Sequence, residues 1–258
     1  MKQRKGETVT TLLSVRSEGW VWALGFTLLI VSVTVPTRRG AQDQPASSTA
    51  SRLVPNFNEP LTQYRAFRRM HARSERFNQE GWVSAWTELD QRGFRYEIVS
   101  EHGSERVRNK VLKAVLKREQ ELVAEGPERA ALTDDNYVFT EPAHPTDGPP
   151  YVLMKPKRKD VVLLDGRIVL SPDGSDVVRI EGRLAKNPSF WTSLVNVTRT
   201  FAKVDGVRVP VATESIAKVK FAGQSRLDVS YEYESINGQP VSISARRVLA
   251  SVAPTGSR

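Results

Sequence analysis

The chain has 258 residues, enough for one large domain or two small ones, with 39% hydrophobic and 26% charged residues, as is ordinary for a globular protein. It contains no cysteine, which excludes a disulfide, a thiolate nucleophile, a cysteine metal site and the lipid anchor of a bacterial lipoprotein. The net charge is +9, but residues 1–41 hold six basic and two acidic side chains, against 32 and 27 in the remainder. The remaining charges mostly alternate in sign, as on solvated faces, which argues against a nucleic-acid partner.

An uncharged apolar run at residues 20–35 follows a polar segment with four basic residues. The run is short for a transmembrane helix, which needs about 20 residues, but suits the core of a secretory signal. We therefore expect residues 1–42 to be an export signal or N-terminal anchor, and residues 43–60 to be a flexible linker. The predicted location is the periplasm, with anchorage in the inner membrane by residues 20–35 as the alternative.

The expected folded part begins at Leu61 with a segment of mixed pattern. Its apolar residues are three apart, as on a helix: Leu61, Tyr64, Phe67 and Met70. We nevertheless interpret the end of the segment as a strand that pairs with residues 82–90 across a connection at residues 78–81. A turn at residues 91–93 then leads to a further strand over residues 94–100.

Trp82 and Trp86 are an even number of residues apart, so they share one face of their predicted strand. We expect both to pack in the core. A hydrophobic ligand cavity between sheet and helix is the alternative environment for them.

The clearest helix follows Gly103, with Ser104 as its N-cap and Gly126 at its end. Apolar residues recur along it at helical spacing: Val107, Val111, Leu112, Val115, Leu116, Leu122 and Val123. The opposite side is basic. A basic amphipathic helix can lie on a membrane, but we expect this one to pack on a sheet, with its basic side in solvent.

Residues 127–150 are predicted to be a long connection that contains a turn of helix near residues 129–135 and a strand fragment over residues 137–140. Connections of this length often act as lids or binding loops. A short strand is expected over residues 151–154. The four basic side chains at residues 155–159 are expected to form a solvated hairpin end, with contact to anionic lipid headgroups at a membrane surface as the alternative.

Two further predicted strand regions come before residues 190–235, where the alternation of apolar and polar residues is strongest. Asp165-Gly166 is the sequence of a tight turn, so we predict a hairpin of residues 161–164 and 167–170. A turn at residues 172–174 leads to a strand over residues 177–184.

Residues 190–235 predict three consecutive antiparallel strands. Between residues 207 and 221, apolar or small side chains occupy the odd positions and most charges the even ones, so one face is apolar and the other wet. Asp205-Gly206 is the strongest hairpin signal in the chain. Asn237-Gly238 ends this meander, and we predict an edge strand over residues 241–248.

Residues with catalytic or metal-binding potential are sparse. The three histidines, His71, His102 and His144, have no ligand spacing, so we predict neither a metal site nor a cofactor. No nucleophile elbow, phosphate loop or dinucleotide fingerprint occurs. The sequence therefore predicts a protein that is not an enzyme. A hydrolase is kept as a third hypothesis because paired carboxylates can converge from distant positions.

The order of elements over residues 160–235 resembles the C-terminal half of outer-membrane lipoprotein-sorting-type proteins, which have the fold of LolA, LolB and RseB. The resemblance is carried by R-x-E-G at residues 179–182, P-S-F-W at 188–191, G-V-x-V-P at 206–210 and S-x-A-x-V at 215–219. It implies an α+β fold in which an unclosed antiparallel β-barrel, a half-barrel, packs on helices. Residues 61–250 would be this single domain, and residues 251–258 a loose tail.

The resemblance also implies a non-enzymatic periplasmic carrier or binding module for an acyl chain, a lipoprotein or another apolar ligand. The expected ligand-facing residues lie on the apolar face of the meander: Trp191, Val195, Val197, Phe201, Val209, Val211, Val219, Leu227, Val229 and Tyr231. The alternative is a structural, interaction or sensor-regulator protein of the cell envelope, in which the same face is merely core.

Overall fold

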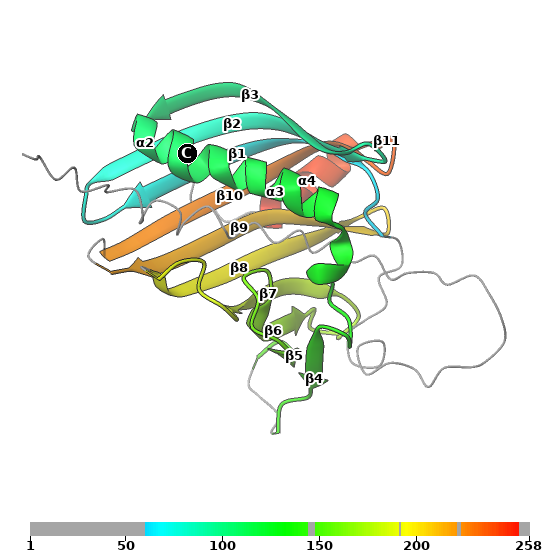
Figure 1. Cartoon of the computed structure of the whole chain (residues 1–258). Coiled ribbons are helices and arrows are strands. Elements are labelled where there is room, and N and C mark those ends of the chain that lie inside the picture. The colour runs from blue at the N-terminus through cyan, green and yellow to red at the C-terminus, as the bar shows by residue number, and fades with distance from the viewer. Residues whose placement is uncertain (1–59, 144–147, 191, 221–222, 253–258) are drawn as a thin grey trace, which may run out of the picture.

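The computed structural model describes residues 60–143, 148–190, 192–220 and 223–252 (Figure 1). The predicted export segment, most of the predicted linker and most of the predicted tail lie outside these residues. Among the residues described, no helix has both the length and the apolar character needed to cross a membrane.

In the described part of the chain, eleven strands form one antiparallel sheet. The strands are β1 (Tyr64–Ser74), β2 (Gln79–Asp90), β3 (Gly93–Gly103), β4 (Tyr137–Thr140), β5 (Tyr151–Pro156), β6 (Leu164–Leu170), β7 (Val177–Leu184), β8 (Thr192–Val204), β9 (Val207–Val219), β10 (Gly223–Ile236) and β11 (Gln239–Pro240). Their order is β3-β2-β1-β10-β9-β8-β7-β6-β5-β4, with β11 beside β10. The predicted large antiparallel sheet is confirmed.

The sheet is not closed, because β3 forms one edge and β4 the other. In the chain, these two edge strands are separated by a long helical segment and, after it, a short 3₁₀ turn (Pro127–Arg129). The long segment consists of α2 (Glu105–Val107), a π turn (Arg108–Leu112) and α3 (Lys113–Glu125). This segment crosses one face of the sheet from β3 toward β4 (Figure 1). Its 1.5 Å rise per residue gives about 30 Å, enough to span several strands. We call it the helical cover.

The helical cover begins and packs as its sequence predicts. The Ser104 hydroxyl accepts a hydrogen bond from the backbone N–H of Val107, and Gly126 follows the last turn with a positive φ of 100°. The π turn adds a residue to one turn of the helix, which is where Val111 and Leu112 are both buried. The predicted helix packed on a sheet is confirmed.

The meander is confirmed strand by strand. In the second half of β9, buried Ser215, Ala217 and Val219 alternate with more exposed residues, as the period of two requires. Residues 209–213 are buried in succession, beside a register shift between β8 and β9. Asp205 and its neighbouring glycine both have positive φ, at 49° and 86°, as expected for the type I′ hairpin turn that this sequence favours.

The predicted hairpin around Asp165 is wrong. Asp165 and Gly166 lie inside β6, where they pair with Arg183 and Gly182 of β7. A Cβ on Gly182 would lie 2.6 Å from the carbonyl oxygen of Asp165, and one on Gly166 would overlap the backbone at Glu181. The glycines are therefore needed for the close approach of two backbones rather than for a turn.

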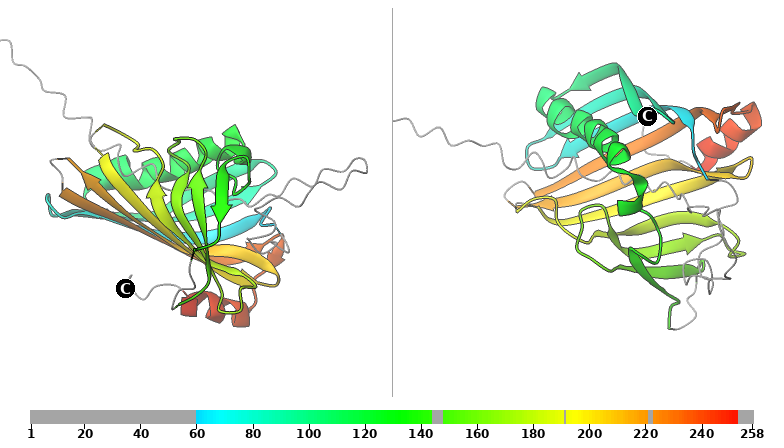
Figure 2. Two further views of the ribbon diagram at one scale, coloured as in Figure 1. Left: turned by 90° about the horizontal axis from the view of Figure 1, so that it is seen from below. Right: turned by 45° about the vertical axis from the view of Figure 1, so that its right-hand side comes forward.

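The predicted edge strand over residues 241–248 is also wrong, because the chain forms the helix α4 (Ile243–Val252). The Ser242 hydroxyl accepts a hydrogen bond from the backbone N–H of Ala245 and caps this helix. Leu249 is buried while Ile243 is exposed, so one side of α4 packs on the strands it contacts, β8 and β10. Figure 2 shows α4 on the side of the sheet opposite α3.

Trp82 and Trp86 share a face, as predicted, but they do not lie in the core. Trp82 stacks between His71 and His102, with ring centroids 4.5 and 4.6 Å away, and both tryptophans are half-buried. The residues of β2 that alternate with them, such as Val83 and Ala85, are buried instead. Small side chains on that face leave room for the helical cover.

We predict that Gly166→Ala lowers the free energy of unfolding by about 1–3 kcal/mol, because the added methyl group forces β6 and β7 apart. Urea unfolding measures the effect. Arg167→Ala, at an exposed neighbour whose ion pair with Glu181 is at the surface, should change stability by less than about 0.5 kcal/mol. Equal effects of the two substitutions would contradict the close approach of the two strands.

Candidate functional site: the covered face of the sheet

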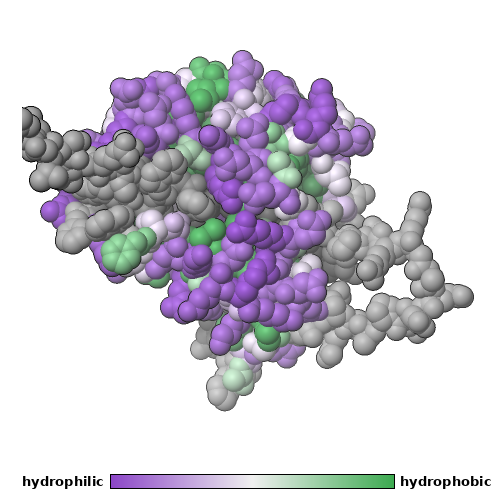
Figure 3. Space-filling model, in the orientation of Figure 1, coloured by the Kyte–Doolittle hydropathy of each residue, from purple (hydrophilic) through white to green (hydrophobic). Residues whose placement is uncertain are grey.

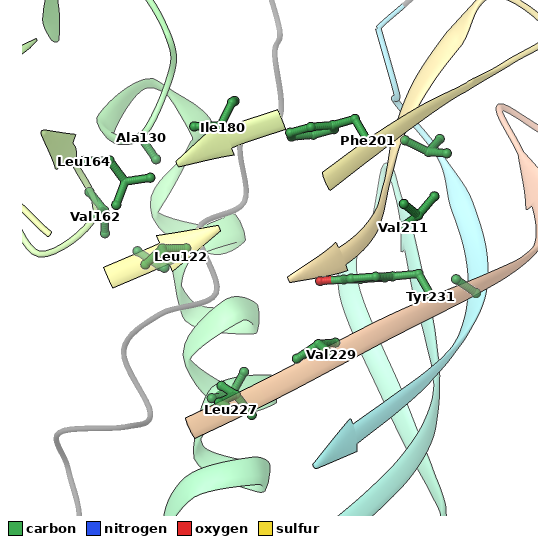
Figure 4. Close-up of a cluster of buried hydrophobic side chains, with 14 of the residues drawn as sticks. Leu122, Ala130, Val162, Leu164, Ile180, Phe201, Val211, Leu227, Val229 and Tyr231 are labelled. Atoms are coloured by element: carbon green, nitrogen blue, oxygen red, sulfur yellow. The ribbon is translucent and has the colours of Figure 1, made fainter. Parts of the chain in front are cut away.

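The sheet face beneath the helical cover, which we call the covered face, is the candidate site. Cross-strand register fixes its members, since directly opposed residues point to the same side. Arg68 lies opposite Tyr231, Val229 opposite Thr213, and Leu227 opposite Ser215. These strands and the cover share one continuous hydrophobic cluster. Figure 4 shows Phe201, Val211, Val229 and Tyr231 on neighbouring strands, and Leu122 on α3, which belongs to the same buried cluster.

The structure places the predicted ligand-facing residues together. Val195, Val197, Phe201, Val209, Val211, Val219, Leu227, Val229 and Tyr231 all belong to this cluster, with exposures between 0 and 6%. Val209 pairs with Ala202 beyond the register shift between Thr200 and Phe201, so it faces the side of Ala202 rather than that of Phe201. Trp191 lies outside the described residues. In the state that the structure captures, the helical cover lies over this apolar wall and shields it from solvent.

One buried ion pair connects the helical cover to the sheet. Arg68, in the middle of β1, donates hydrogen bonds from both terminal nitrogens to the two carboxylate oxygens of Glu119 on α3, one of them at 2.8 Å. Arg68 is 1% exposed and Glu119 is 2% exposed. A bidentate pair of this kind fixes the orientation of the helix as well as its distance from the strand.

Aromatic rings surround the guanidinium of Arg68. The Tyr64 hydroxyl accepts a hydrogen bond from it at 2.5 Å, and the rings of Tyr231 and Phe94 lie 4.7 and 5.1 Å away. Burial by itself lowers the pKa of Arg68, but the charge of Glu119 and the tyrosine hydroxyls outweigh it, and the pKa lies well above its ordinary value. Burial raises the pKa of Tyr64, so this phenol stays neutral. The pair is therefore a fixed cation and anion in an apolar and aromatic setting.

Further polar groups lie on the covered face. The hydroxyls of Thr213, Ser215 and Tyr231 are buried and form no hydrogen bond within the described residues. Arg199, which is 7% exposed, lies opposite Thr213 and 5.8 Å from the ring of Phe201. A buried hydroxyl without a partner costs stability, so this face carries hydrogen-bonding capacity that its own fold does not use.

The outer side of the helical cover is polar. Arg108 and Lys113 form ion pairs with Glu101 of β3 at 2.9 and 2.7 Å, and Gln120 donates a hydrogen bond to the backbone of Phe94. Figure 3 shows a mainly hydrophilic surface on this side, with small apolar patches. These exposed contacts are individually weak, which leaves the buried side of the cover to hold it in place.

Sequence reasoning did not identify Arg68, Glu119, Arg199, Thr213 or Ser215 as parts of the site. The signal was nevertheless present for the ion pair. If residues 64–72 are taken as a strand, Arg68 is the one charge among the inward positions Tyr64, Ala66, Met70 and Ala72. Glu119 likewise falls within the apolar stripe of its helix. Opposite charges at two predicted buried positions indicate that they pair.

Comparison with known proteins adds little to this geometry. No protein-family model matches the chain, and no curated protein matches it. Among solved structures, the chain is similar to the crystal structure of a DUF1329 family protein from Desulfovibrio piger, at 11% identity over 66% of this chain and 83% of that one, with a TM-score of 0.31. So low a TM-score supports no argument about fold or function.

The buried ion pair of Arg68 and Glu119 leads to a quantitative prediction about stability. Glu119→Gln should lower the free energy of unfolding by about 3–5 kcal/mol, because it leaves the Arg68 charge buried without its counter-ion. The double variant Arg68→Met with Glu119→Leu should be within about 1 kcal/mol of the wild type, since similar apolar volume replaces both charges. Urea unfolding of Arg68→Met, of Glu119→Leu and of the double variant gives the coupling between the two sites.

Additive effects of these substitutions would show that Arg68 and Glu119 do not depend on each other. Glu121→Gln on the same helix serves as the control, because Glu121 is exposed and its partner Arg118 contacts Glu125 as well.

Proposed function

We propose that the protein is a non-enzymatic binding module that holds an apolar ligand, such as an acyl chain or a lipoprotein lipid, between the covered face and the helical cover. The observation that carries the proposal is an unclosed sheet whose apolar face is covered by one helix and linked to it by one buried ion pair. The resemblance to outer-membrane lipoprotein-sorting-type proteins favours the same function. It also favours a periplasmic location and a role in envelope biogenesis.

Ligand entry in this proposal requires the helical cover to move. The proposed ligand-facing side chains are buried in the captured state, so an acyl chain reaches them only where the cover withdraws. Each CH₂ group that the ligand then buries contributes about 0.8 kcal/mol, which offsets the loss of contacts between helix and sheet. Arg68 and the hydroxyls of Thr213 and Ser215 would meet the polar end of such a ligand, which favours an amphiphile over a plain hydrocarbon.

A second candidate function rests on the burial of the same predicted ligand-facing residues. Nine of the ten predicted ligand-facing residues are packed in the core as found, which is also what a structural, interaction or sensor-regulator protein of the envelope requires. In that case the helical cover stays in place, and the protein acts through its outer surface. The two functions differ in one measurable respect, namely whether the covered face binds an acyl chain.

The proposal predicts that the purified protein binds a fluorescent fatty acid and that Glu119→Gln raises its affinity about tenfold. Weakening the link between α3 and β1 increases the fraction of molecules with the cover withdrawn, and apparent affinity scales with that fraction. Fluorescence titration measures the dissociation constant. Glu121→Gln is the matched control on the exposed side of α3 and should leave the affinity unchanged.

Absence of binding by both the wild type and Glu119→Gln, while both remain folded by circular dichroism, would exclude the carrier and favour the structural alternative.

The buried hydroxyls give a separate prediction. Thr213→Val should raise the free energy of unfolding by about 1 kcal/mol, because it removes a buried hydroxyl that has no partner among the described residues. The same change should weaken fatty-acid binding about twofold to tenfold, the effect of one lost hydrogen bond. Thr198→Val, on the opposite side of neighbouring β8, controls for the higher strand propensity of valine. A loss of stability in Thr213→Val would show that the hydroxyl serves the fold.

A further inference from the structure

A second site lies away from the covered face, in a cavity of about 480 Å³ at one end of β5–β8. Its walls are the end of β5 with the residues that follow it, Asp165 of β6, Arg183 of β7 and the connection into β8. The volume lies in the range of ligand pockets, roughly 300–1,000 Å³. The cavity therefore has room for a small polar ligand.

The charge of the cavity is strongly one-sided. Five of its lining side chains are cationic (Lys155, Lys157, Arg158, Lys159 and Arg183), and one is a carboxylate. That carboxylate, Asp165, already pairs with Arg183 at 3.2 Å. Positive charge on a concave surface attracts and concentrates anions.

One of these cations is held in place, and three remain available. Arg158 donates hydrogen bonds to the side chain of Asn136 and, at 2.7 Å, to the carbonyl oxygen of Arg129, and it lies 3.7 Å from Asp160. Lys155, Lys157 and Lys159 make no salt bridge with any described residue. A guanidinium held by hydrogen bonds beside three exposed ammonium groups is a combination suited to a phosphate group.

An exposed aromatic residue lies in the connection that contributes Asn187 to this cavity. Phe190, 78% exposed, falls in the connection between the lining residues Asn187 and Ser193, and the ammonium of Lys220 lies 4.3 Å from its ring. Aromatic side chains accompanied by cations are favoured at the interface of a lipid bilayer.

We propose that this cavity binds a phosphate group, either on the headgroup of an anionic phospholipid or on a small soluble phosphate ester. The proposal does not depend on whether the covered face binds an acyl chain, since the two sites share none of the residues named for them. Phe190 favours the lipid headgroup as the source of the phosphate group, because an exposed aromatic ring is favourable at a bilayer interface and does not contribute to the binding of a soluble phosphate ester.

Two probes test the proposal with the full-length protein. One is vesicles of equimolar phosphatidylcholine and phosphatidylglycerol, compared with phosphatidylcholine alone, so that membrane association unrelated to charge is subtracted. The other is glycerol phosphate, followed by titration calorimetry. The cavity variant is Lys155→Gln with Lys157→Gln and Lys159→Gln. The control, Arg73→Gln with Arg76→Gln and Lys117→Gln, makes the same change in net charge at exposed positions outside the cavity.

We expect the cavity variant to bind the favoured probe about a hundredfold less tightly, at about fivefold for each lysine, while the control changes little. Phe190→Ala distinguishes the two sources: it should weaken binding to anionic vesicles but leave glycerol phosphate unaffected. Binding of neither probe by the wild type would overturn the proposal, and so would an equal loss of affinity in the cavity variant and the control.

Discussion

The pairing of β1 with β10 is the constraint on which the rest of the architecture depends. It joins the first three strands to the far end of a meander that the chain completes much later. As a result β3 and β4, which the chain connects directly, lie at opposite edges of one sheet. The segment between them has to cross the sheet, and an amphipathic helix is the form in which it buries its apolar side against the strands while satisfying its own backbone. The helical cover is thus a consequence of topology.

The buried ion pair between Arg68 and Glu119 is harder to explain by stability. Removing two charges from water costs several kcal/mol per ion, and apolar replacements of such pairs are often as stable or more so. The hydroxyls of Thr213 and Ser215, which have no partner in the part of the chain that the structure describes, also lower stability. Polar groups that do not stabilise a core are found where a protein has to open or bind. This is the physical reason for proposing that the covered face exchanges its contacts with the helical cover for contacts with a ligand.

Much of the fold follows from local pattern, because a strict period of two and a capped amphipathic helix each have one structural solution. The meander, the Asp205 turn, β4 and the helix beginning after Ser104 were predictable for that reason. The structure around Asp165-Gly166 was not predictable, because a glycine that permits a turn also permits the close approach of two strands. Residues 241–248 were not predictable either, because a ten-residue helix of mixed polarity contains a strand-like alternation of polar and apolar residues. The site was predicted on its apolar side only. Arg68 and Glu119 are 51 positions apart; their inward positions in a strand and a helix indicate that each is buried, and the three-dimensional structure shows the geometry in which they meet.

The central claim, that the helical cover withdraws from the sheet to admit an apolar ligand, is open to one direct measurement. Because the chain lacks cysteine, Lys117→Cys on the exposed side of α3 and Glu232→Cys on the outer side of β10 place two spin labels specifically. Pulsed electron paramagnetic resonance then gives the distance distribution between helix and sheet with and without a fatty acid. The account predicts a second, longer distance that grows with added fatty acid. A single distance that is unchanged at saturating fatty acid would contradict it.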